Sequence, residues 1–418
     1  MKTRLACISL AVTAALAGAC ATPGASTSKD GVKVDAGVTD DEIKIGLFNG
    51  YTGPVAAGAI AGAAGFDARL AKANAAGGVC GRQLKSVRAD TKYDPAVAVQ
   101  AYRANVKDIV MIGQLLGATS IYGLSQQIAR DGIATLAATS AAEVIKLENV
   151  YLFTTPFPMY VINGLDWAKK EQAGSDGKLK VGVIYQDDAF GQEGQKAVRY
   201  VETNDPDIEV VAEAAYDVKA EDLTAQVLKM KKAGAETVWI HGIASKTGPI
   251  LSQASQLDYS PHWLTVDSGY ETAMAKQLGR LVDKLHVVTS SVLYTENVPA
   301  MAEVKQNVEK VAPGTKPDQL VIAGWVDASV AVAALEKACK DKDLTQKGVV
   351  AAMSGLSVTT NGLSPDLKYG SGDADSRIPS RQTRMNKIDT KTGVPVPVTG
   401  FGATDLAGKW RLADGSKS

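Results

Sequence analysis

Short apolar runs alternate with longer amphipathic stretches along most of the chain. The predicted strands are 43–48, 84–89, 109–112 and 134–137, followed by 179–185, 208–212, 237–241, 262–266 and 285–289. Between them, apolar residues recur at helical spacing in 62–74, 95–106, 121–129, 161–170, 194–201, 223–232 and 249–257. Such alternation predicts an α/β fold with parallel sheets and right-handed crossovers. A break near residues 155–158 separates two such series, which predicts two lobes.

The rest of the chain follows a different pattern. Residues 303–353 are predicted to be helical again, and the tail beyond them is predicted to be irregular with short strands. We find no internal repeat of solenoid period. No stretch after the first twenty residues is expected to be long and apolar enough to span a membrane.

The first residues are typical of an export signal. Lys2 and Arg4 precede an apolar run over 5–19, so residues 1–19 are predicted to be a signal peptide. Residues 16–20 read LAGAC and resemble a bacterial lipobox, in which Cys20 becomes the first mature residue and carries a lipid. The alternative is plain secretion with a cut after Ala21. Residues 20–41 are expected to be a lipid-anchor site and flexible tether.

The charge balance excludes one class of partner, and the position of each cysteine suggests its role. The 45 basic residues balance the 45 acidic ones, so nucleic acid is not an expected partner. Of the four cysteines, Cys7 leaves with the signal and Cys20 is the lipid candidate. In an oxidising compartment the remaining two, Cys80 and Cys339, either form a disulfide or remain separate thiols.

The sequence carries no recognisable catalytic set. None of the three histidines is spaced with another His, Cys or Glu in a metal-binding pattern, and no phosphate loop follows a strand. The GGVCG run at 77–81 follows a helix and precedes a strand, which predicts a helix C-cap and turn. His241 ends an apolar strand and is expected to line a cleft. We therefore predict a non-enzymatic protein without cofactor or metal.

Five motifs in order resemble a known family. They are GVTDDEIKIG at 37–46, TGP at 52–54, AGGVCGR at 76–82, the set Asp90, Tyr93, Asp94 and Pro95, and DAFG at 188–191. The chain resembles the type I periplasmic solute-binding proteins of branched-chain amino-acid and amide ABC transporters, in their lipoprotein form. The resemblance runs from Gly37 to about Lys340 and weakens beyond.

This resemblance implies an architecture and a function. Two Rossmann-like lobes would be joined by three hinge crossings, with 42–156 and 290–365 in the first lobe and 157–289 and 366–418 in the second. A small molecule would be captured between the lobes by hinge closure. The protein would act outside the cytoplasm as a lipid-anchored monomer that serves ABC transporter permease subunits. The alternative is a sensor for a membrane signalling partner, because the fold serves both uses.

The resemblance also assigns candidate ligand-binding residues. Positions that hold a carboxylate in the family fall on Ala118, Thr119, Ser120, Thr139 and Ser140. In the second lobe the matching positions are Phe190 as an aromatic wall, Gly242 and Ile243 after a strand, and Asp267 as the acid for an α-ammonium group. Two alternatives stay open, since Thr119 and Asp267 are also placed to cap helices.

Four positions depart from relatives of known amino-acid specificity. Ala57 and Gly58 replace a ring, Ile243 replaces an aromatic residue, and Ala118 replaces a serine. The smaller side chains predict a roomier pocket, and the missing serine hydroxyl removes one group that would bind the carboxylate. The expected ligand is therefore a branched-chain or related amino acid, an amide or a small organic acid, with room for something larger.

Overall fold

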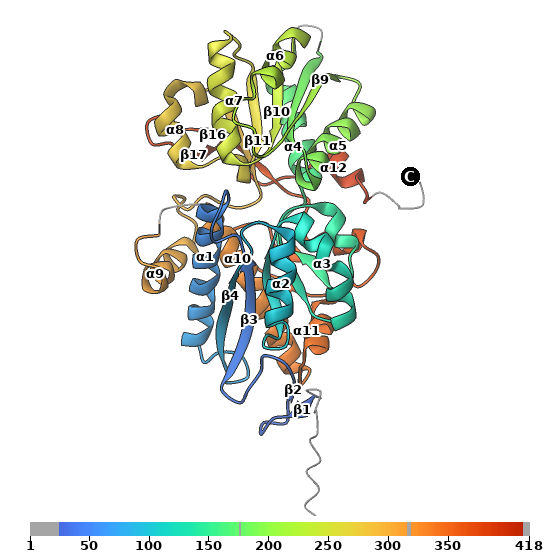
Figure 1. Cartoon of the computed structure of the whole chain (residues 1–418), viewed down its shortest axis with the longest axis vertical. Helices are drawn as coiled ribbons and strands as arrows, with labels where there is room; N and C mark the ends of the chain where they lie inside the picture. Colours follow the sequence, from blue (N-terminus) through green and yellow to red (C-terminus); the bar gives the residue numbers. More distant parts are fainter. Residues whose placement is uncertain (1–24, 175–176, 316–318, 413–418) are drawn as a thin grey trace, which may run out of the picture.

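The chain folds into two α/β lobes stacked along the long axis of the molecule (Figure 1). This computed structural model describes residues 25–174, 177–315 and 319–412. The predicted signal peptide and Cys20 lie outside the described residues. The α/β fold with parallel sheets that the sequence predicted is confirmed.

The first lobe is built on a five-stranded parallel sheet with helices on both faces. Alternate side chains of its central strand point to opposite faces. Ile45 and Leu47 pack with α1 and α10, whereas Phe48 packs with α2 and α3. In spatial order the strands are β4 (Gln83–Asp90), β3 (Glu42–Asn49), β5 (Met111–Leu116), β6 (Thr135–Ala138) and β7 (Val150–Leu152); the helices are α1 (Ala56–Ala75), α2 (Pro95–Asn105), α3 (Ala118–Asp131), α9 (Met301–Val311), α10 (Gln319–Lys340) and α11 (Gln346–Met353).

The second lobe has a seven-stranded sheet whose last two strands come from the tail of the chain. Val238 and Ile240 face α6 and α7, while Trp239 between them faces α4 and α5. In spatial order the strands are β17 (Pro395–Pro397), β16 (Arg384–Ile388), β12 (Leu285–Thr289), β11 (His262–Val266), β10 (Thr237–His241), β8 (Leu179–Gln186) and β9 (Ile208–Tyr216); the helices are α4 (Phe157–Gln172), α5 (Ala189–Asn204), α6 (Thr224–Ala233), α7 (Ala244–Gln256), α8 (Thr272–Leu278) and α12 (Asp405–Lys409). β16 and β17, from the tail that was expected to hold short strands, are antiparallel to their neighbours, unlike the other strands of this sheet.

Three segments of the chain pass between the lobes. The first follows β7, the second follows β12, and the third leads from the small hairpin of β14 (Ser357–Val358) and β15 (Leu367–Lys368) to β16. Hydrogen bonds tie the crossings to one another. Thr154 Oγ1 lies 2.6 Å from Ser290 Oγ, and Thr155 Oγ1 donates to the carbonyl oxygen of Gln382 over 2.8 Å.

Helix α10 is the core helix of the first lobe. By length and composition it is apolar enough to cross a membrane, so the expectation that no later stretch would be was too strict. However, 67% of its most apolar window is buried inside the lobe. Close contact with α1 explains the burial, because a Cβ at Gly324 would lie 1.9 Å from the carbonyl oxygen of Gly62. Only glycine allows the two helices to approach so closely.

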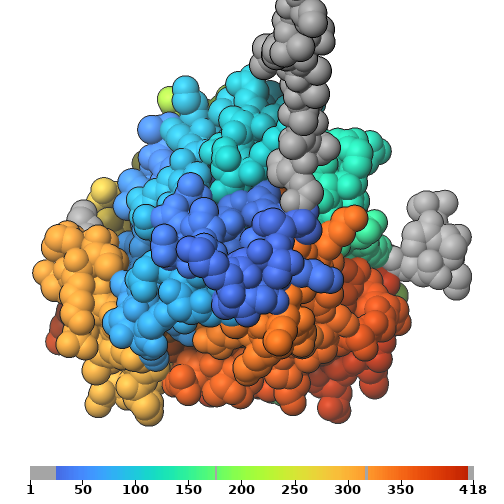
Figure 2. Space-filling model, turned by 90° about the horizontal axis from the view of Figure 1, so that it is seen from below, coloured from blue at the N-terminus to red at the C-terminus, as the bar shows by residue number. Residues whose placement is uncertain are grey.

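The N-terminal segment is folded against the end of the first lobe that lies away from the second lobe. Strands β1 (Ser26–Thr27), β2 (Lys33–Val34) and β13 (Asp343–Leu344) form a small sheet there. Figure 2, which views the molecule from this end, shows the blue N-terminal segment beside the orange one. The expectation of a flexible tether up to residue 41 was therefore wrong for residues 25–41.

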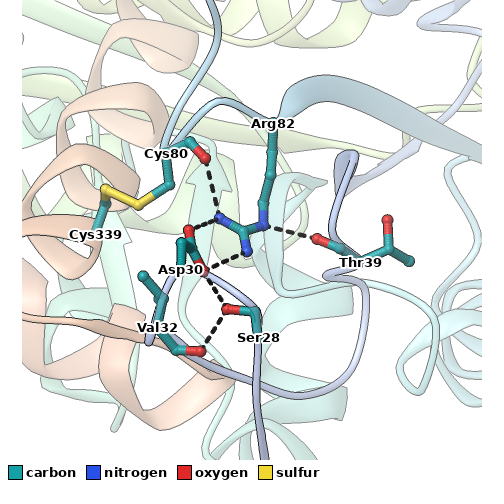
Figure 3. Close-up of a disulfide and its surroundings, with 7 residues drawn as sticks. All are labelled: Ser28, Asp30, Val32, Thr39, Cys80, Arg82 and Cys339. Atoms are coloured by element: carbon teal, nitrogen blue, oxygen red, sulfur yellow. Dashed lines mark hydrogen bonds and ion pairs between the residues drawn. A yellow bond between two sulfur atoms is a disulfide. The ribbon is translucent and has the colours of Figure 1, made fainter.

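A buried arginine fastens this segment. Arg82 is 2% exposed; its Nη1 lies 2.8 Å from Asp30 Oδ2, and its Nε donates to the carbonyl oxygen of Thr39 over 2.7 Å (Figure 3). The hydrogen bond from the Arg82 guanidinium holds the pKa of the Asp30 carboxyl well below its usual range. Next to it a disulfide joins Cys80 to Cys339 on α10, with the two Cα atoms 6.0 Å apart.

We expect removal of this disulfide to destabilise the first lobe. The bond closes a loop across a sequence separation of 259 residues, and the loss of so long a cross-link lowers the free energy of unfolding by about 3–5 kcal/mol. The double variant Cys80→Ser, Cys339→Ser should therefore show a clearly lower denaturant midpoint. Reducing agent should lower the midpoint of the unsubstituted protein equally and leave the variant unchanged; equal midpoints in all samples would contradict this prediction.

Candidate functional site

A cavity of about 300 Å³ lies between the two lobes, at the carboxyl ends of the strands of both sheets. Crevices at this edge of parallel sheets are where α/β proteins bind their ligands. Its lining is mainly apolar, and among the described residues it contains two acids and no Lys, Arg or His. An anionic ligand would therefore meet helix dipoles and hydroxyl groups here in place of a basic side chain.

Six of the nine predicted binding residues line this cavity. Ala118, Thr139 and Ser140 do so from the first lobe. Phe190, Ile243 and Asp267 do so from the second. The chain thus brings together residues that are up to 149 positions apart in sequence (118 to 267), with hydroxyl groups on one side and an aromatic ring and an acid on the other.

The other three predicted residues do not line the cavity. The side chain of Thr119 is exposed on the first turn of α3, and Ser120 is buried at 3% exposure. Gly242 is covered by Tyr216, whose hydroxyl oxygen would lie 1.8 Å from a Cβ at this position. Thr119 does not cap α3, because it lies within the helix and Gly117 is the N-cap residue, without a side-chain hydrogen bond.

Several helices begin at the cavity without a side-chain cap, among them α3 and α7, one from each lobe. α3 begins at Ala118 in the first lobe, and α7 begins at Ala244 in the second, after Ile243 as its N-cap residue. The first N–H groups of a helix have no partner within it, and the helix dipole favours negative charge at this end. By contrast, Asp188 caps α5 by accepting from Gly191 N over 3.0 Å. The two uncapped ends together suit a carboxylate.

Asp267 is held in place by neighbours from both lobes. Its Oδ1 accepts from the N–H of Ser268 over 2.8 Å, and its Oδ2 accepts from the Tyr160 hydroxyl over 3.0 Å. The backbone oxygen of Asp267 accepts from Gln319 Nε2, on the first residue of α10, over 2.7 Å. Asp267 opens a short 3₁₀ helix, η2 (Asp267–Gly269). Its carboxylate is therefore oriented before any ligand arrives.

Aromatic rings form the wall of the second lobe. Phe157 and Phe190 line the cavity with their ring centroids 4.9 Å apart. His241 was expected to line the cleft, but it lies behind these two rings and is fully buried. Burial lowers the pKa of His241 to about 3, and its Nδ1 accepts from Trp239 Nε1 over 3.1 Å. This histidine is therefore a neutral part of the core.

The residues that the sequence reading missed lie mostly on the first lobe. The part of the lining that α1 and α10 contribute there is apolar, and we call this part of the cavity its apolar arm. Its walls are Ala57, Gly58, Gly62, Leu320, Ala323, Gly324, Val326 and Leu367, and Asn49 and Gln114 also line it. The small residues Ala57 and Gly58 were the signal in the sequence. The contribution of α10 had no such signal, because its apolar pattern serves the core and the cavity alike.

No group of three or more His, Cys, Asp or Glu side chains is placed to hold a metal ion in the part of the chain that the structure describes.

Comparisons with known proteins agree with this geometry. The family model for periplasmic binding proteins matches residues 42–393. The chain belongs to this family. The prediction of an extracytoplasmic solute-binding protein that works with an ABC transporter is confirmed at this level.

Individual relatives are distant in sequence but similar in fold. The Leu/Ile/Val-binding protein homolog 7 of Brucella abortus (strain 2308) is 24% identical over 316 residues, which cover 71% of this chain and 77% of that protein. The fatty acid ABC transporter substrate-binding protein from Thermomonospora curvata has a TM-score of 0.85 at 25% identity, covering 93% of this chain and 99% of that one. A branched-chain amino acid ABC transporter protein from Thermus thermophilus with bound valine has a TM-score of 0.75 at 21% identity, covering 88% and 98%.

A buried acid joins the lobes of this periplasmic binding protein at one side of the cavity. Glu193, on α5 of the second lobe, accepts a hydrogen bond from the N–H of Ala142 in η1 (Ala142–Lys146) of the first lobe. Burial raises the pKa of Glu193 to about 8, opposed in part by this bond. Glu143 and Lys196 are the charged groups that act on it, and the Tyr122 hydroxyl lies nearby. At neutral pH the acid is therefore mostly protonated.

We expect this acid to make the folded, closed form less stable as pH rises. Below about pH 4.5 Glu193 is protonated whether exposed or buried, so it carries no penalty. Between about pH 5 and 8 the exposed form loses its proton and the buried form keeps it, so closure and folding become progressively less favourable, by a total on the order of 3 kcal/mol. The midpoint of thermal unfolding should fall over this range.

The matched control is Glu193→Gln, which keeps an acceptor for Ala142 but cannot ionise. Its unfolding midpoint should fall less between pH 5 and 8 than that of the unsubstituted protein. Two parallel pH profiles would show that Glu193 does not carry the effect.

Proposed function

We propose that this protein captures an amphipathic carboxylic acid, with an apolar chain larger than the side chain of valine, and delivers it to an ABC importer. The carboxylate is held between the N-termini of α3 and α7, beside Thr139 and Ser140. The chain lies in the apolar arm next to α1 and α10. The observation that carries the proposal is this combination of uncapped helix ends with an apolar arm and no basic side chain in the lining.

The named ligands of two relatives fit this reading. One similar structure is described as a fatty acid transporter's binding protein, and another holds valine. Both ligands are carboxylates attached to an apolar group. Ala57 and Gly58 widen the site on the side where the apolar group would lie, which favours the longer chain.

An apolar α-amino acid is the second candidate, and the acids of the lining favour it. Asp267 and Glu271 both face the cavity. An ammonium group beside them would be neutralised, whereas a plain fatty acid would meet two like charges. For Asp267 the repulsion is reduced by the hydrogen bonds that it accepts from Tyr160 and Ser268.

We expect straight-chain carboxylic acids to bind more tightly as they lengthen, until the arm is full. Each buried methylene contributes about 0.8 kcal/mol, or roughly a fourfold change in Kd. Calorimetric titration with acids of increasing length measures the series, with leucine, isoleucine and valine as the comparison. Binding of these amino acids alone, lost in Asp267→Asn, would transfer the proposal to the second candidate.

A larger side chain in the arm should reduce the chain length of the acid that binds most tightly. Ala323→Leu places a larger side chain in the arm, so long acids should lose about tenfold or more in affinity while the shortest acids keep theirs. Glu336→Leu, at an exposed position of the same helix, is the control and should change neither. Equal losses for short and long acids would place the chain elsewhere.

We further propose that Cys20 carries a lipid and that the protein works as a monomer at the outer face of the cytoplasmic membrane. The LAGAC run at 16–20 supports the lipid, and a cavity whose walls both come from one chain supports the monomer. Cys20→Ser should move the protein from the membrane fraction to the soluble fraction of its host. Unchanged fractionation would exclude the anchor.

A further inference from the structure

Two buried amides interrupt the otherwise apolar arm of the cavity. Asn49 ends β3 and is 2% exposed; Gln114 lies in β5 and is 3% exposed, and both line the cavity. Asn49 Nδ2 donates to Gln114 Oε1 over 2.6 Å and lies 3.5 Å from the Tyr51 hydroxyl. The amides therefore form a short chain of hydrogen bonds at the first-lobe side of the arm, whose other walls are carbon.

An acid without a charged partner stands behind these amides. Asp327 of α10 is fully buried, and neither of its carboxyl oxygens has a hydrogen bond of normal geometry among the described residues. The Gln114 amide lies beside it and opposes the effect of burial, which nevertheless raises the pKa of Asp327 well above its usual range. Asp327 and burial in turn raise the pKa of Tyr369, whose hydroxyl donates to the carbonyl oxygen of Leu152. The cluster is thus polar, and no charged side chain of the described cavity lining lies on this side.

Such a cluster is costly against a purely hydrocarbon ligand. A buried amide or carboxyl group that lacks a hydrogen-bond partner weakens a complex by about one to two orders of magnitude in Kd. Buried polar side chains in proteins almost always have partners. An alkyl end in this arm would exclude water from Asn49 and Gln114 and give nothing in return.

We propose that Asn49 and Gln114, with Asp327 beside Gln114, form a second polar subsite that binds an uncharged hydrogen-bonding group, a hydroxyl or an amide, at the far end of the ligand. The proposal rests on the proposed function and names its substrate class. The ligand is a bifunctional acid, with the carboxylate between the lobes and a neutral polar group in the first lobe. A charged far end does not fit, because no counter-charge lies in the lining on this side.

The test compares matched pairs of acids that differ only at the far end. Straight-chain alkanoates of four to ten carbons and the corresponding ω-hydroxyalkanoates are titrated into the protein. At one chain length the hydroxylated acid should bind at least tenfold more tightly, since only that length brings the hydroxyl to the amides. Away from that length the alkanoate should bind equally well or better.

Variants assign the preference to these residues. Gln114→Met keeps the size of the side chain and removes its polar group, so the preference for the hydroxyl should vanish. Asp327→Asn keeps a neutral polar partner for Gln114 and should retain the preference, whereas Asp327→Leu should lose it. Thr139→Val, at the carboxylate end, should weaken both members of a pair by the same factor. Asn49→Leu replaces Gln114→Met if the latter fails to fold.

The outcomes separate the subsite from the function on which it rests. If alkanoates bind and no hydroxylated acid exceeds its partner at any length, the subsite is refuted and the proposed function stands. If neither series of acids binds at any chain length, both the subsite and the proposed function are refuted. A preference that survives Gln114→Met and Asn49→Leu would overturn the assignment to these residues.

Discussion

The hydroxyl of Tyr160 is the interaction on which the geometry of the site depends. A carboxylate can only accept, so the Tyr160 hydroxyl donates to Asp267 in the cavity, and its oxygen lies 2.6 Å from Oγ of Ser290 in the second crossing. Ser290 in turn contacts Thr154 in the first crossing. Burial and the nearby Asp267 charge raise the pKa of Tyr160, so the phenol keeps its proton. Two of the three crossings and the acid of the cavity therefore form one hydrogen-bonded unit.

This unit constrains how the lobes can move. Gln319 of the first lobe holds the backbone of Asp267, and Glu193 of the second lobe holds Ala142 of the first. Both contacts cross the cavity region, so an opening motion must break them, whereas the bonds between the crossings can persist. The contacts that hold the two lobes together at the cavity thus differ from the contacts between the crossings. A ligand that binds both lobes adds further contacts of the first kind and therefore favours the closed arrangement.

The parallel strands could be predicted from sequence because their side chains mainly pack in the core. Strands 237–241, 262–266 and 285–289 were predicted with the bounds that the structure has, since both faces of these strands are mostly buried and their sequences are mainly apolar. The antiparallel strands β16 and β17 were not placed, because their pairing with β12 is set by the path of the chain and not by local pattern. Residues 25–41 are held by Arg82 and by strand β13, which are both distant in sequence, so no local signal predicts their fold.

For the site, the stretch of chain that lies at the cavity was easier to predict than which of its side chains face the cavity. Ala118, Thr119 and Ser120 are consecutive, yet only Ala118 faces the cavity, because successive residues of a helix turn by about 100°. Small residues at 57 and 58 indicated space, but which residues line that space depends on α10, which approaches α1 through Gly324. This approach brings Asp327 behind Gln114 and leaves Leu320 and Ala323 as walls of the arm. One helix therefore supplies the core, the apolar wall and the buried acid, so selection for packing and selection for ligand act on the same residues.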